Sequence, residues 1–170
     1  TIPSLSSWLS ENTPKIKTMT KSFDPIEATV GQIHEAMRAG AVTSRELVDW
    51  YLDRIDAYDR DGPALNSIVT INPNAPERAN ELDAAFEESG FIGPLHGIPV
   101  LVKDQSETAD IRTTFGSEVF DDYVPDSDST VVRMLKDAGA IVLAKTNLCD
   151  WAASWFGYSS VIGRTKNPYV

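Results

Sequence analysis

A lysine stands at the end of an apolar run that is typical of a buried strand. Residues 98–102 read Ile-Pro-Val-Leu-Val, and Lys103 follows them directly. On residue types alone, the simpler interpretation is that the strand emerges into water there, with the lysine stem covering apolar surface and the ammonium solvated. The alternative is an amine held in apolar surroundings, where it could act as a base.

Four other side chains, two beside this run and two around a later one, could take part in acid–base or nucleophilic chemistry. Asp104 should point to the opposite face from Lys103, which favours a turn or a structural hydrogen-bonding carboxylate over a catalytic acid. His96 precedes the strand, and we expect it to pack or to hydrogen-bond locally. Lys145 ends a second apolar run and is the closest competitor of Lys103. Cys149 has no histidine near it in sequence, so a packed thiol is expected.

The first half of the chain predicts helices that would build a core. Val30, Ile33 and Met37 share one helical face that ends at Gly40, and His34 lies beside that face as a packed residue. The next two helices show capping spacing at Thr43 with Glu46 and at Asn74 with Glu77. The apolar stripe of the first of these helices is core: Leu47, Val48, Tyr51, Ile55 and Tyr58. A short β-rich run, residues 67–71, lies between the two helices, and Pro76 suits the first turn of the later one.

The second half predicts strand, crossover helix and strand. Residues 99–102 and 140–145 are continuous apolar runs, typical of strands covered on both faces, and residues 128–139 predict the helix between them. Such a crossover implies a parallel pair. The two lysines that end these strands are therefore expected at the same edge of the sheet, which is where open α/β folds place their sites.

Composition excludes several classes of function. The chain has 170 residues, 42% hydrophobic, with a formal charge of −10, which argues against direct binding of nucleic acid or of anionic membrane. One cysteine and two histidines make an internal disulfide impossible and argue against a metal site. No apolar run is long enough to span a membrane and no signal peptide is evident, so the cytoplasm is the expected location.

The order of several sequence blocks resembles the N-terminal part of the amidase signature family. The blocks are GPLHGIPVLVKD, TTFGS, VVRMLKDAGAIVLAKTNLCDWA and SSVIGRTKNP. The resemblance implies an α/β fold, with a large mixed twisted sheet covered by helices on both faces. It divides the chain into a polar N-terminal arm (1–23) and the N-terminal portion of a single amidase signature domain (24–170).

The resemblance also implies roles for individual residues. Family members hydrolyse carboxamides with a Ser, cis-Ser, Lys triad and without a cofactor, and the triad lysine matches Lys103. To act as a base near neutral pH, a lysine needs its pKa lowered from about 10.4 by roughly three units, worth about 4 kcal/mol, which burial at an apolar strand end can supply. Lys145 matches a structural position. Trp151 and Ala152 are expected to border the acyl pocket, unless Trp151 belongs to the core.

The same resemblance predicts that the chain is incomplete. The family's Gly- and Ser-rich segment, which carries both serines and the oxyanion-hole donors, lies downstream of the last block, while Ser159 and Ser160 lack its glycine flanks. We therefore expect the chain to be inactive alone and to require the remainder of the domain. Without that complement Val100, Val102 and residues 141–143 are expected to stay partly exposed, which favours association or poor solubility.

Three functions remain open at this stage. The first is an amidase that acts on a small-molecule amide, with homo-oligomerisation left open. The second is the glutamine-hydrolysing component of a tRNA-dependent amidotransferase, which would need partner subunits. The third is a non-catalytic α/β interaction module.

Overall fold

The computed structural model describes residues 23–168. Its α-helices are α2 (Val30–Arg38), α3 (Ser44–Ile55), α4 (Ala75–Ser89) and α5 (Thr130–Asp137). Short helical turns follow at η1 (Asp56–Arg60), η2 (Glu118–Phe120) and η3 (Asp150–Ala152). The strands are β1 (Ile68–Ile71), β2 (Pro99–Lys103), β3 (Ile141–Thr146), β4 (Tyr158–Ser159) and β5 (Gly163–Arg164). The expected arm, residues 1–23, lies outside the described range except for its last residue, so its boundary stays a prediction.

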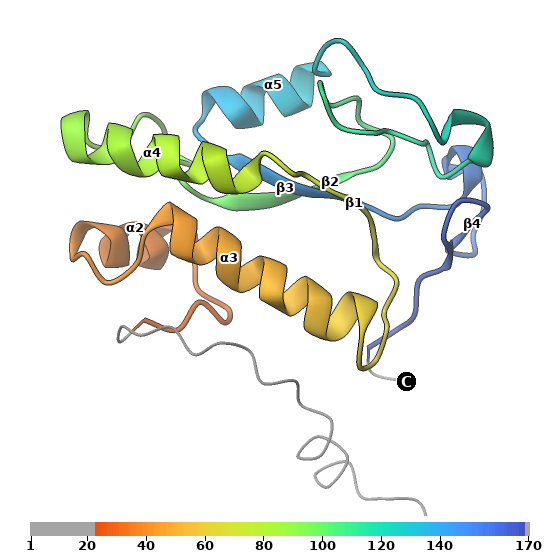
Figure 1. The fold of residues 1–170 in the computed structure, drawn as a ribbon, viewed down its shortest axis with the longest axis horizontal. Coiled ribbons are helices and arrows are strands. Elements are labelled where there is room, and N and C mark those ends of the chain that lie inside the picture. The colour runs from red at the N-terminus through yellow and green to blue at the C-terminus, as the bar shows by residue number, and fades with distance from the viewer. Residues whose placement is uncertain (1–22, 169–170) are drawn as a thin grey trace, which may run out of the picture.

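Three strands form a mixed sheet in the order β1-β3-β2 (Figure 1). The central strand, β3, pairs antiparallel with β1 and parallel with β2. The connection from β2 to β3 contains α5, so the predicted strand, helix and strand unit is confirmed. Within the described residues β2 is an edge strand, and this position matters for the site.

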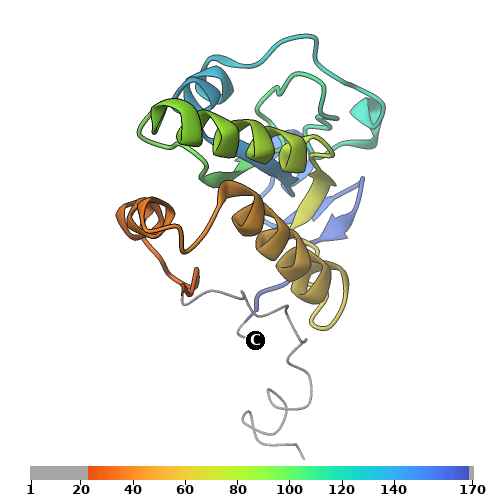
Figure 2. The ribbon, with the colours of Figure 1, turned by 60° about the vertical axis from the view of Figure 1, so that its left-hand side comes forward.

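Helices cover both faces of this sheet. On one face α3 and α4 pack through Val48 and Leu82 against Ile141 of the central strand. On the other face Val132 of α5 packs against Val102 of β2. Figure 2 shows α3 and α4 side by side in front of the sheet. Figure 1 shows α3 and α5 on opposite sides of the strands. The expected α/β class, a mixed sheet with helices on both faces, is confirmed.

Local signals placed most helix ends correctly. The Thr43 side chain accepts a hydrogen bond from the Glu46 N–H, and the Glu46 carboxylate accepts one from the Thr43 N–H, so the predicted capping box at the start of α3 is present. The prediction for Asn74 is wrong in its detail, because that side chain makes no capping hydrogen bond. Instead the side-chain oxygen of Asn72 accepts from the Asn74 N–H at 2.9 Å, which forms an Asx turn ahead of α4.

The expectation that the core strands stay partly exposed is wrong for most of the residues concerned. Val102 and residues 141–143 are at most 6% exposed, because α3, α4 and α5 already cover both faces of the central strand. The exposed apolar residue of this sheet is instead Leu101, which is 52% exposed on the edge strand. The other strongly exposed apolar side chains of residues 23–168 include Val119, Trp155 and Phe156.

Candidate active site at the carboxyl edge of the sheet

Both strand-end lysines lie at the carboxyl edge of the parallel pair, as the crossover predicted. Val102 of β2 is the partner of Lys145 of β3, and Lys103 is the partner of Thr146. Successive side chains of a strand alternate between faces, so the two lysines point to opposite faces of the sheet.

A register shift separates the two lysines. Val100 pairs with Val142, and this register continued along the strands would set Lys103 directly beside Lys145. The register moves by one residue between Val100 and Leu101, so that Leu143 is left without a partner on β2. A one-residue shift exchanges the faces to which side chains point. The shift therefore removes a like-charge pairing, which would be unfavourable.

Lys145 is fully buried and engaged. Its ammonium donates to the Ser106 carbonyl at 2.8 Å and to the Thr113 hydroxyl at 2.7 Å. It also lies 3.5 Å from a carboxylate oxygen of Asp104. Burial lowers the pKa of Lys145 from its usual value, while the Asp104 carboxylate opposes that shift. These contacts agree with the structural role expected for this lysine, which holds both backbone and a carboxylate.

Asp104 faces the same buried space from the end of β2. Its second carboxylate oxygen accepts hydrogen bonds from the N–H of Thr114, at 3.0 Å, and from the Thr114 hydroxyl. The oxygen that faces Lys145 has no shorter partner among residues 23–168. The sequence predicted a structural carboxylate on the face opposite Lys103, and this prediction is confirmed. It did not predict that Thr114 would donate to this carboxylate, or that neighbouring Thr113 would accept from Lys145. Two consecutive threonines after an acidic turn were the available signal.

Lys103 is exposed, as the simpler interpretation predicted, and the apolar strand end does not by itself desolvate it in the described structure. It lies on the same side of β2 as Leu101, and β2 has no neighbour on its outer edge in the described structure. No hydrogen bond or ion pair joins its ammonium to another residue of the range 23–168. The strand end thus presents a free cation on an uncovered face.

Trp151 and Ala152 lie in η3, close to the same edge. The Trp151 N–H donates to the Phe115 carbonyl at 2.8 Å, and the Phe115 N–H donates to the Asp104 carbonyl at 3.2 Å. Two backbone hydrogen bonds therefore connect the Trp151 turn to the residue that follows Lys103. The indole is 56% exposed and meets the Phe120 ring edge-on, so the alternative that Trp151 is core is wrong. Ala152 is exposed beside it.

The histidines are structural. Nε2 of His34 lies 3.0 Å from the His96 carbonyl, so it carries the proton and donates. Nδ1 of His96 accepts from the Ile92 N–H at 3.3 Å. Burial, with a contribution from nearby His34, lowers the pKa of the fully buried His96. Both predictions of packed histidines are confirmed.

The remaining nucleophile candidates are also engaged in packing. The Cys149 thiol is buried, donates to the Ser154 carbonyl and accepts from the Ser154 N–H, which confirms a packed thiol. The Ser159 hydroxyl is buried and donates to the Gly116 carbonyl. The Ser160 hydroxyl accepts from the Glu118 N–H.

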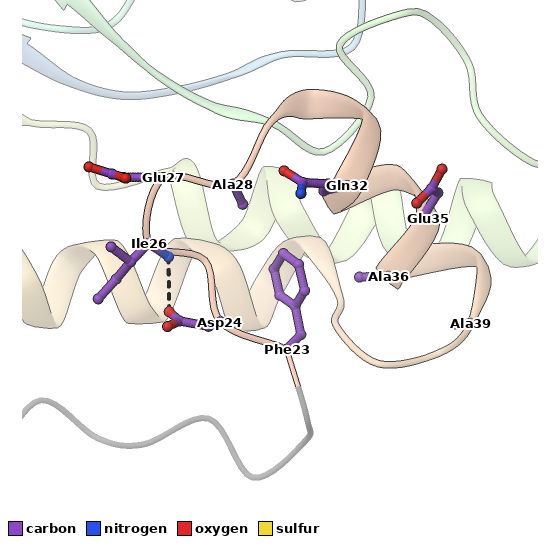
Figure 3. A pocket seen from close by; sticks show the side chains of 9 residues that line it. All are labelled: Phe23, Asp24, Ile26, Glu27, Ala28, Gln32, Glu35, Ala36 and Ala39. Carbon is purple, nitrogen blue, oxygen red and sulfur yellow. Dashed lines mark hydrogen bonds between the residues drawn. The ribbon is translucent and has the colours of Figure 1, made fainter.

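Two hollows of the surface do not include Lys103. One, of about 420 Å³, lies between α3 and the sheet and is lined on the sheet side by Pro99, Leu101 and Leu143. The other, of about 480 Å³, lies beside α2, where Phe23 and Ala36 line it together with the acidic residues Asp24, Glu27 and Glu35 (Figure 3). Because α2 contacts residue 96, just before β2, this second hollow lies at the opposite end of β2 from Lys103.

Neither a metal site nor a membrane span is found in the part of the chain that the structure describes. Across residues 23–168, no three His, Cys, Asp or Glu side chains gather in a group that could hold a metal ion. The helices of this range also include none with the length and apolar character needed to cross a bilayer.

The fold and the strand-end groups define an α/β protein with two lysines at the carboxyl ends of its parallel strands, the edge where open α/β folds place their sites. Residues 46–170 match the Amidase family model, and the chain belongs to the amidase family. It is 36% identical over 143 residues to a subunit of the glutamyl-tRNA(Gln) amidotransferase of Halorhodospira halophila, an alignment that covers 84% of this chain and 29% of that protein.

Solved structures agree with this assignment. The peptide amidase of Stenotrophomonas maltophilia superposes with a TM-score of 0.80 at 42% identity, over 85% of this chain and 30% of that one. An amidase family protein of Bacillus anthracis superposes with a TM-score of 0.79 at 38% identity, over 85% and 30% of the two chains. The chain thus spans about 30% of the length of the relatives it matches.

Proposed function

We propose that this chain is the N-terminal part of an amidase that hydrolyses a carboxamide C–N bond through a Ser, cis-Ser, Lys triad, with Lys103 as the base. The contrast between the two strand-end lysines carries this proposal. Lys145 is fully buried among Asp104, Ser106 and Thr113, whereas the Lys103 ammonium is exposed and has no partner among residues 23–168. Of the two lysines, only Lys103 is available to groups arriving from another segment.

The proposed reaction needs two serines from the downstream part of an amidase domain. The neutral Lys103 amine takes a proton from the bridging serine as that serine takes one from the nucleophilic serine. The nucleophile adds to the amide carbon, the C–N bond breaks, and the leaving amine departs with the relayed proton. Water then attacks the acyl-enzyme ester, and the acid and the free serine form. The same downstream residues would cover Lys103 and remove its ammonium from water.

Trp151 and Ala152 are proposed to line the acyl side of the substrate. Their turn is tied through Phe115 to the residue after Lys103, and the Trp151 indole offers a large exposed apolar surface. We expect Trp151→Ala to raise KM for bulky acyl groups more than for small ones, measured on a series of carboxamides of increasing acyl size. An equal change across the series would contradict a pocket role.

The central test uses the protein that carries these residues together with a complete amidase domain. Lys103→Ala is expected to lower kcat for ammonia release by about 10²- to 10⁴-fold, the usual range for general acid–base catalysis. Lys136→Ala is the matched control, because Lys136 lies on α5, pairs with Asp128 just before that helix, and is not among the site residues. Full activity of the Lys103 variant would refute the role of Lys103 as the base, whereas a parent protein that releases no ammonia from any carboxamide would favour a non-catalytic module.

A second candidate is the glutamine-hydrolysing component of a tRNA-dependent amidotransferase, favoured by the 36% identity to a subunit of such an enzyme. Ammonia release from glutamine, compared with release from a peptide carboxamide, separates the two. A preference for glutamine that grows when partner subunits are added would support the second candidate. A cytoplasmic location and a homo-oligomeric state stay predictions.

A further inference from the structure

We propose that Lys145 and Asp104 are positioning residues for Lys103, acting through a buried cluster that fixes the end of β2. The strand-end cluster consists of Asp104, Ser106, Thr113, Thr114 and Lys145. This inference rests on the proposed function, since it concerns the geometry of the base.

The backbone that follows Lys103 is held at several points. The Lys103 carbonyl accepts from the Ser106 N–H at 2.9 Å, and the Ser106 carbonyl accepts from the Lys145 ammonium at 2.8 Å. The Asp104 N–H donates to the Thr146 carbonyl at 3.1 Å. The turn that closes on Lys103 is therefore pinned to the central strand both by its backbone and by the Lys145 side chain.

The two threonines tie a second segment to the same point. The Thr113 hydroxyl accepts from Lys145 and donates to the Ile111 carbonyl at 3.2 Å. The Thr114 hydroxyl donates to the Asp104 carboxylate and accepts from the Gly116 N–H at 3.1 Å. Since Phe115 follows these threonines and accepts from the Trp151 N–H, the cluster joins the end of β2 to the proposed acyl wall.

A purely stabilising role does not require this chemistry. A buried ion pair is often no more stabilising than apolar side chains of similar volume. The polar cluster is therefore better explained by a second role, which is to fix the direction of the end of β2. The end of β2 needs such a support, because β2 is an edge strand and pairs with only one neighbour, β3, in the described sheet. Without a tether from β3, the last residue of an edge strand is free to move, and Lys103 moves with it.

Catalysis is sensitive to such movement, because a displacement of about 1 Å at a reacting group can cost about 100-fold in rate. The test compares Thr113→Val with Thr113→Ser in the complete amidase. Lys103→Ala is measured in the same assay to test the proposed function separately. Valine replaces the hydroxyl with a methyl group and so removes the acceptor for Lys145 together with the donor to the Ile111 carbonyl, while serine keeps the hydroxyl. Each kcat is normalised to the folded fraction, measured by near-UV circular dichroism at the assay temperature.

We expect Thr113→Val to lower kcat by about 10- to 100-fold while KM changes by less than about threefold. We expect Thr113→Ser to retain a kcat within about threefold of the parent. If Lys103→Ala is inactive but Thr113→Val keeps its kcat per folded molecule, the positioning role is overturned and the proposed function stands. Equal losses in the valine and serine variants would also overturn it, because packing would then be the cause. An active Lys103→Ala protein would end both proposals.

Discussion

Replacing Lys145 with methionine should destabilise the protein far more than the same replacement at Lys103. Methionine keeps an unbranched apolar stem and removes the charge, so the two variants differ mainly in what the lost ammonium contacted. At Lys145 the change leaves the Asp104 carboxylate buried, with one oxygen facing an uncharged thioether in place of an ammonium at 3.5 Å. Both side chains of this pair are 0% exposed, so solvent does not compensate for the loss.

The magnitude follows from this burial. Removing one partner of a buried pair costs about 3–5 kcal/mol of unfolding free energy, because the other charge stays desolvated. At exposed Lys103 the change should stay within about 0.5 kcal/mol. If the complete domain desolvates Lys103, as we propose, its loss is neutral or stabilising, since a buried amine without a counter-charge is unfavourable.

Urea denaturation of the complete protein, followed by far-UV circular dichroism, measures the difference in free energy when the m-value is unchanged. A third variant, Lys145→Met with Asp104→Asn, tests the cause. An amide still accepts from Thr114 but carries no charge, and a buried neutral group costs only about 1–3 kcal/mol when unpaired, so this variant should be more stable than Lys145→Met alone. Equal losses at the two lysines, or no recovery in the double variant, would refute the reasoning.

Three further outcomes are expected. Gly116→Ala should destabilise the protein by more than about 1 kcal/mol in the same urea assay, because φ is +75° and a Cβ would meet the Leu148 carbonyl at 2.6 Å; an unchanged midpoint would contradict this. The hydrogen bond to Glu107 raises the pKa of Tyr123 above 10.0, so its contribution to stability is complete below that pH and is lost as the pH rises through the folded value. The stability difference from Tyr123→Phe should therefore shrink above pH 10, and a constant difference would count against it. Residues 1–170 produced alone should self-associate through exposed side chains such as the fully exposed Trp155, and a monomer in analytical ultracentrifugation would argue against that.

Much of the fold was predictable because its signals are local. The capping box at Thr43 and Glu46 pairs groups three residues apart, and Gly40, the predicted glycine stop after α2, adopts φ +66°. Continuous apolar runs separated by a helix predict a parallel pair, because the helix returns the chain to the end of the sheet where the first strand began. The cap at Asn74 failed because Asn72, two residues earlier, offers its side-chain oxygen to the same turn.

The location of the candidate site was predictable, but the burial and the hydrogen-bond partners of its side chains were only partly so. Lys103 and Lys145 follow similar apolar runs, so sequence predicts both at the carboxyl edge and cannot separate them by burial. The register shift between Val100 and Leu101 separates their faces, and such a shift depends on how two strands fit against α3, α4 and α5. The threonine partner of the Asp104 carboxylate comes from ten residues downstream, and no periodicity links them.

The sequence by itself determined the element order, the α/β class, the shared edge of the two lysines and the resemblance to amidases, because each depends on local pattern or on chirality. Only the tertiary structure decided that Lys145 is buried with Asp104 and that Lys103 is exposed. The physical reason is that burial depends on neighbours: β3 lies between two strands and two helix layers, whereas β2 is flanked by one strand in the described sheet.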